Sequence, residues 1–175
     1  MKRLAIDGYG QLELNQVAFR RDGRIEAQCQ LDADIDYVEN GMLLAIDQTT
    51  RTVGYPTEDS EFIALNYTTE HMYDERLAYG LKHFRLDNGT FLPRLGYLAK
   101  GDKFTTNCIS VEDSAAAGAK ATAAEVKTVI EAGAYGHASA DGTILVNGTA
   151  DKAVLKVVCA TTMPDGQFAV KFIAL

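Results

Sequence analysis

The sequence predicts a mainly β fold, either a β-barrel or a sandwich of short antiparallel strands. Two observations support this prediction. Apolar residues alternate with polar residues along several short runs, and this is the period of a half-buried strand. Asx-Gly dipeptides, which suit hairpin turns that need a positive φ, separate these runs. They occur seven times in the 175 residues, at Asp7-Gly8, Asp22-Gly23, Asn40-Gly41, Asn88-Gly89, Asp141-Gly142, Asn147-Gly148 and Asp165-Gly166.

The first element is a long alternation of apolar and polar residues. Apolar side chains stand at every second position over residues 25–37, which predicts one long strand with a bulge or a bend. The chain then divides into an N-terminal arm with this long strand over residues 1–40 and a β-rich domain over residues 41–175. A single domain over residues 1–175 is the alternative.

Three aspartates, Asp32, Asp34 and Asp36, lie within this alternation and resemble the start of a calcium loop. A calcium loop would need glycine at its sixth position, where this chain has Tyr37. We therefore expect these aspartates on the solvated face of the strand and predict no metal ligands.

The middle of the chain predicts two hairpins, a strand and one helix. Residues 42–55 form a hairpin with a four-residue loop, and residues 62–67 form a strand. Apolar and aromatic residues then recur at three- and four-residue steps over about 69–80, which predicts the helix. Residues 94–109 consist of two apolar runs around Gly101 and predict a central hairpin. The charged residues expected in solvent at its turn are Lys100, Asp102 and Lys103.

The last third begins with an Ala/Gly-rich excursion over about 112–124, which has little apolar area to bury. Residues 122–133 fit a capped helix or a β-branched strand, and both alternatives remain open. Strands follow at 143–147 and 153–160, and the latter pairs with 167–175 in a terminal hairpin.

Composition and charge argue against several classes of function. The formal net charge of −7 is opposite to that of most proteins that bind nucleic acid, so no nucleic-acid partner is expected. No apolar run is long enough to span a membrane, and the N-terminus lacks an apolar signal core, so we expect synthesis in the cytoplasm. The three cysteines are far apart and the three histidines lack ligand spacing, so no zinc site or other cofactor is predicted.

Positive charge is concentrated near the N-terminus. These side chains are candidates for contact with an acidic protein neighbour, and a solvated face is the alternative. The candidate contact residues are Lys2, Arg3, Arg20, Arg21 and Arg24.

No short catalytic motif occurs in the chain. It contains no dinucleotide-binding glycine fingerprint, no phosphate-binding loop, no nucleophile elbow and no HExxH zinc motif. The sequence therefore predicts that the protein is not an enzyme and has no catalytic residues.

Five segments carry a resemblance to a protein family. They are Gly101–Asn107, Phe62–Tyr67 with Glu70–Glu75, and Thr162–Gly166 with Ala169–Phe172. In these segments the chain resembles small virion proteins of tailed bacteriophages, most of all the head decoration, or cement, proteins.

This resemblance covers roughly residues 41–175 and implies a function as well as a fold. It implies a non-enzymatic, barrel-like viral structural protein that binds the outer surface of a phage head and stabilises it by protein–protein contacts. The implied partners are the major capsid protein, neighbouring virion proteins or further copies of the chain. The implied location is the virion, after synthesis in the host cytoplasm.

Two other functions stay open on the sequence. One is a tail- or fibre-associated binding module that recognises carbohydrate through exposed tyrosine and acidic residues. The other is a small hydrolase or metal-dependent enzyme, for which Asp32, Asp34 and Asp36 would be the starting point.

Overall fold

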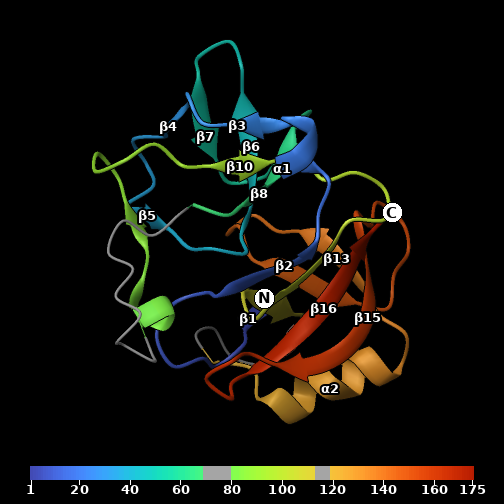
Figure 1. Ribbon diagram of the computed structural model, residues 1–175. Coiled ribbons are helices and arrows are strands. Elements are labelled where there is room, and N and C mark those ends of the chain that lie inside the picture. The colour runs from blue at the N-terminus through green and yellow to red at the C-terminus, as the bar shows by residue number, and fades with distance from the viewer. Residues whose placement is uncertain (69–79, 113–118) are drawn as a thin grey trace.

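A computed structural model of the chain describes residues 1–68, 80–112 and 119–175. The helix expected over about 69–80 lies outside the described residues except for Gly80, and so do residues 113–118 of the Ala/Gly-rich excursion. The described part is mainly β, as predicted, with its strands in three sheets. It forms a sandwich-like arrangement and not a closed barrel (Figure 1).

The larger sheet occupies the lower half of Figure 1 and has eight strands. Its neighbouring strands are antiparallel except at one pair, β12 with β14. In spatial order the strands are β1 (Lys2–Arg3), β12 (Ile109–Val111), β14 (Ile144–Asn147), β13 (Tyr135–Ala138), β15 (Leu155–Thr162), β16 (Phe168–Ala174), β11 (Lys103–Thr106) and β2 (Leu12–Gln16).

The smaller sheet lies above it and has six strands. In spatial order they are β3 (Ile25–Glu26), β10 (Leu95–Gly96), β8 (Ile63–Asn66), β6 (Leu43–Asp47), β7 (Thr52–Gly54) and β4 (Gln30–Leu31). A separate ribbon pairs β5 (Tyr37–Val38) with β9 (Leu86–Asp87), and the helices are α1 (Phe19–Asp22), the 3₁₀ turn η1 (Gly80–His83) and α2 (Ala123–Glu131).

Two apolar clusters hold these layers together. The first joins the inner face of the larger sheet to α2 and to the facing side of the smaller sheet, and it contains Phe104 and Phe172 with ring centroids 5.7 Å apart. The second lies on the other side of the smaller sheet. Leu43 enters the first cluster and its neighbour Leu44 enters the second, because successive side chains of a strand point to opposite faces.

The terminal hairpin and the hairpin of β6 and β7 are confirmed, with β15 paired to β16 along most of its length. Helix α2 resolves the open choice at 122–133. Thr122 caps it, because its hydroxyl accepts a hydrogen bond from the Glu125 N–H at 3.3 Å while the Glu125 carboxylate accepts one from the Thr122 N–H at 2.6 Å. This local exchange favours the helix over a strand.

The long strand predicted over 25–37 is wrong. The structure has three two-residue strands there, β3, β4 and β5. The first two lie at opposite edges of the smaller sheet, and β5 lies in the separate ribbon. A turn interrupts the run, since the Ile35 N–H bonds to the Asp32 carbonyl at 3.1 Å and the Asp34 N–H bonds to the Asp32 carboxylate at 3.1 Å. The side-chain hydrogen bond favours a turn at this aspartate over an extended backbone.

The central hairpin predicted over 94–109 is also wrong. β10 joins the smaller sheet and β11 joins the larger one, so the turn between them links the two layers. Asp102, expected in solvent, is only 5% exposed, and its carboxylate accepts hydrogen bonds from the N–H groups of Ala18 at 2.8 Å and Ala99 at 2.9 Å. The aspartate therefore fixes the crossing from one sheet to the other.

Candidate functional site

A groove of about 410 Å³ lies on the smaller sheet, at the end of the β6–β7 hairpin. Its floor is formed by Ala45 and Gly54, which pair across the two strands. Ala45 and Asp47 lie on the same face of β6 as Leu43, because side chains two residues apart share a face. Leu43 is buried in the first apolar cluster, and the groove lies where this face continues towards the hairpin tip.

The groove is hollow because Gly54 has no side chain. A Cβ atom placed on Gly54 would meet no other atom within 4 Å, so the space above this residue is open. Gln48 marks one wall, and its side-chain amide is held at 2.9 Å by the Tyr97 hydroxyl and at 3.2 Å by the Glu26 carboxylate. Phe62 also lines the groove and is 45% exposed.

The lining of the groove is acidic. Carboxylates come from three separate segments, and no lysine, arginine or histidine is among the lining residues. These carboxylates are Asp32, Asp47, Asp59 and Glu61. Hydroxyl groups of threonine and serine residues stand between them. Such a surface suits a ligand that donates hydrogen bonds and carries positive charge, or one with many hydroxyl groups.

The carboxylates differ in their surroundings. Asp47 accepts hydrogen bonds from the N–H groups of Thr49 at 2.7 Å and Thr50 at 3.2 Å. The hydrogen bonds from Thr50 and then Thr49 lower the pKa of Asp47. Asp59 and Glu61 make no hydrogen bond or ion pair with another described residue, so their charges face the groove unpaired.

A second polar feature lies in the interior, where Arg3 and Glu39 form an ion pair. The guanidinium donates to both carboxylate oxygens, with one distance of 2.8 Å, and the Gly10 N–H also donates to Glu39. The Glu39 side chain is 1% exposed and that of Arg3 is 29% exposed. Burial alone would lower the pKa of Arg3, but the hydrogen bonds and charge of Glu39 outweigh it and raise the pKa.

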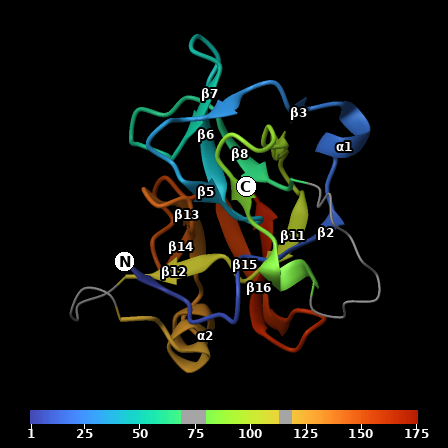
Figure 2. The same ribbon diagram turned by 90° about the vertical axis from the view of Figure 1, so that its left-hand side faces the viewer.

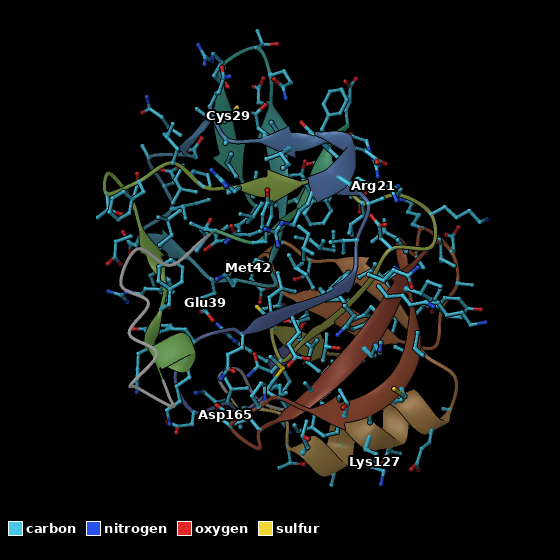
Figure 3. All side chains as sticks on the ribbon, viewed as in Figure 1. Arg21, Cys29, Glu39, Met42, Lys127 and Asp165 are labelled. Atoms are coloured by element: carbon cyan, nitrogen blue, oxygen red, sulfur yellow. The ribbon has the colours of Figure 1, made fainter. Side chains whose placement is uncertain are left out.

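Arg3 is in β1 of the larger sheet, and Glu39, labelled in Figure 3, lies between β5 of the two-stranded ribbon and β6 of the smaller sheet. The pair therefore links the larger sheet to the segment that leads into the smaller one. The neighbouring thiol of Cys108 is fully buried, which raises its pKa to about 12 and keeps it neutral. A neutral, enclosed thiol is a poor nucleophile. The Arg3–Glu39 pair and the Cys108 thiol therefore have a structural role, and the groove remains the candidate functional site.

The basic residues singled out from the sequence do not form one patch. Lys2 pairs with Glu125 of α2 at 2.8 Å and holds the pKa of that carboxyl down to about 2. Arg3 is in the interior ion pair described above, and Figures 1 and 2 show α1 well away from β1.

Arg20, Arg21 and Arg24 lie on or just after α1. Arg20 is exposed, Arg21 pairs with Asp22 at 2.8 Å, and Arg24 lies 3.7 Å from the same carboxylate. These three side chains remain together on one part of the surface and are separated from Lys2 and Arg3.

The three aspartates considered for a metal are also divided. Asp32 lines the groove, whereas Asp34 and Asp36 are exposed elsewhere on the surface. Within residues 1–68, 80–112 and 119–175, no group of three or more His, Cys, Asp or Glu residues is placed to hold a metal ion. In the same ranges no helix is long and apolar enough to cross a membrane.

The sequence alone did not reveal the groove. The acidic residues of 58–61 look like a solvated loop, and Asp32 and Asp47 are distant from them in the chain. A partial signal existed, since small residues at Ala45 and Gly54 interrupt two apolar runs, but their pairing is visible only in the folded sheet.

Comparison of the chain with protein-family models, with curated proteins and with solved structures finds no match to any of them.

Proposed function

We propose that this protein is a non-enzymatic module that acts by binding other proteins, and that it decorates the outer surface of a bacteriophage head. The observation that supports binding is the groove beside β6 and β7, where the carboxylates of Asp59 and Glu61 have no partner among the described residues. The resemblance of residues 41–175 to decoration proteins supports the location on a phage head.

The construction of the scaffold agrees with a structural role. The smaller sheet is buried on both faces, and the Arg3–Glu39 pair and Asp102 tie it to the larger sheet through hydrogen bonds. A rigid support holds a binding surface in one geometry and lowers the entropic cost of association. Such a body suits repeated attachment to a regular shell.

The test is to purify particles from cells that make the protein and to measure its ratio to the major capsid protein. We expect a fixed ratio in purified heads and density for the chain on the outer shell by cryo-electron microscopy. Recovery only in the soluble lysate, with none in purified particles, would show that the proposal is wrong.

The groove also favours a second candidate, the carbohydrate-binding module of a tail or fibre. The exposed ring of Phe62 beside carboxylates and hydroxyls offers both stacking and hydrogen bonds to a sugar. Glycan-array binding that is lost in Glu61→Gln and kept in Glu58→Gln would favour this candidate, since Glu58 is in the same loop but does not line the groove. Absence of any glycan signal would remove it.

A further inference from the structure

The larger sheet has a basic outer face. Ile173 of β16 pairs with Lys156 of β15 on one side and with Lys103 of β11 on the other, so the two lysines flank it in one row. Lys171 lies two residues from Ile173 on β16 and therefore points to the same face. We call the surface formed by Lys103, Lys156 and Lys171 the lysine face.

The lysine face is turned away from the apolar core. The alternate residues Val170 and Phe172 of β16 are fully buried in the first cluster, and α2 packs against that cluster through Val126. Ile173 belongs to neither cluster. The bulge in β15 adds Val158 to this region of the surface, where it is 50% exposed.

The charges of the lysine face are not neutralised within the described part of the chain. None of its three lysines forms an ion pair with a carboxylate of the described residues. A carboxylate on this face is that of Glu13 in β2, which pairs with Thr105, while Thr105 in turn pairs with Lys171. Glu13 and Lys171 are thus two strands apart, about 10 Å.

The lysine face and the acidic groove are complementary in charge but cannot meet within one molecule. The groove is at the β6–β7 end of the smaller sheet, and the lysine face is on β15, β16 and β11 of the larger one (Figures 1 and 2). Each surface also carries an exposed apolar side chain, Phe62 at the groove and Val158 at the lysine face. Charge with apolar contact is a combination that protein interfaces use.

We propose that copies of this chain associate head to tail, with the lysine face of one copy seated on the acidic groove of the next. This inference rests on the proposed function, since it names a second copy as a protein that the groove binds. The contact joins two different surfaces, so each added copy leaves a groove free at one end and a lysine face free at the other. Closed rings or extended arrays follow, as a repeating shell component would need.

Sedimentation velocity of the full chain over a concentration series tests the proposal. The salt concentration should be about 0.1 M, where screening over about 10 Å weakens the repulsion between net negative copies but leaves close ion pairs largely intact. We expect wild type to form dimers and larger species as its concentration rises. A protein that stays monomeric throughout the series would overturn the proposal.

Matched variants identify the two surfaces. Glu61→Lys reverses a groove charge, and Glu58→Lys makes the same change in the same loop outside the groove. Lys156→Glu reverses a charge of the lysine face, and Lys127→Glu makes the same change on α2 (Figure 3). We expect Glu61→Lys and Lys156→Glu each to weaken association about tenfold or more, while the two controls match wild type.

Mixing the two interface variants gives the decisive result. Glu61→Lys keeps an intact lysine face and Lys156→Glu keeps an intact groove, so the mixture should form at least a dimer at concentrations at which neither variant associates alone. Failure of the mixture to form this dimer, or equal weakening by the controls, would overturn the proposal.

A groove-filling variant tests the same contact without changing charge. Gly54→Val places a side chain in open space, so the protein should fold and its association should still weaken. Unchanged association of this variant would contradict a contact in the groove. If the wild-type protein is monomeric throughout the concentration series but still binds to heads in a fixed ratio, the head-to-tail contact is wrong and the proposed function stands.

Discussion

Replacement of Arg3 by methionine should destabilise the protein more than replacement of its partner Glu39 by glutamine. Arg3→Met keeps most of the apolar stem but leaves the Glu39 carboxylate, whose side chain is 1% exposed, with the Gly10 N–H as its one donor among the described residues. Breaking a buried ion pair in this way costs about 3–5 kcal/mol. That is a large part of the roughly 5–15 kcal/mol by which a domain is stable.

The reverse change should cost less because the two partners differ in exposure. In Glu39→Gln the remaining guanidinium is 29% exposed and can bind water, and the amide oxygen can still accept the Gly10 hydrogen bond. We expect a loss of about 1–3 kcal/mol, the cost of an imperfectly satisfied polar group. The double variant Arg3→Met/Glu39→Leu should lose less than the sum of the single losses, because it leaves no unpaired charge.

Urea unfolding followed by circular dichroism measures these differences as shifts of the midpoint at constant slope. Equal losses in the two single variants would refute the reasoning from burial.

Three further predictions address packing, titration and reactivity. Gly96→Ala should destabilise the protein by about 1–3 kcal/mol, because the new Cβ would lie 2.5 Å from the buried ring of Phe19. Gly54→Ala in the same sheet should be close to neutral, because no atom lies within 4 Å of its Cβ. Urea unfolding compares the two variants, and equal losses of stability would contradict the contact geometry. Burial would raise the pKa of Asp141, but hydrogen bonds from neighbouring hydroxyl and amide groups lower it, so its contribution to stability is present above about pH 4 and is lost as the pH falls through the folded-state value. Asp141→Asn should therefore flatten the acid limb of the stability curve, and an unchanged limb would count against these hydrogen bonds. A thiol reagent should modify one cysteine, Cys159, in the native protein and all three after unfolding, because the other two are buried. Mass spectrometry of the modified peptides identifies the labelled cysteines. Rapid labelling of a second cysteine in the native protein would disagree with the structure.

Local features of the sequence were good guides where the partner was close along the chain. The Met163–Gly166 turn joins β15 to β16, and the hairpin of β6 and β7 has its loop in the expected place. Thr122 and Glu125 satisfy each other's backbone groups within one helical turn. In the two hairpins turn chemistry acts over a few residues, so periodicity and residue type were sufficient to predict the element. The capping residues suggested a helix at 122–133, but they left a strand open as the alternative.

The failures occurred where a distant partner decided the outcome. Gly101 was expected to join two strands of one hairpin, yet β10 and β11 pair with strands that are remote in sequence and lie in different sheets. Asp102 was expected in solvent, yet the amides of Ala18 and Ala99 surround its carboxylate. A short apolar run pairs equally well with several strands, and only the packing of the whole chain selects among them.

The candidate site depends on tertiary structure even more than the fold does. Sequence patterns alone determined the β class, the turn between β6 and β7 and the terminal hairpin, because local hydrogen bonds and side-chain periodicity control these features. The tertiary structure decided that Arg3 and Glu39 meet in the interior, that carboxylates from three segments surround Gly54, and that lysines of three strands share one face. Those juxtapositions follow from the register and the order of the strands, which long-range burial sets.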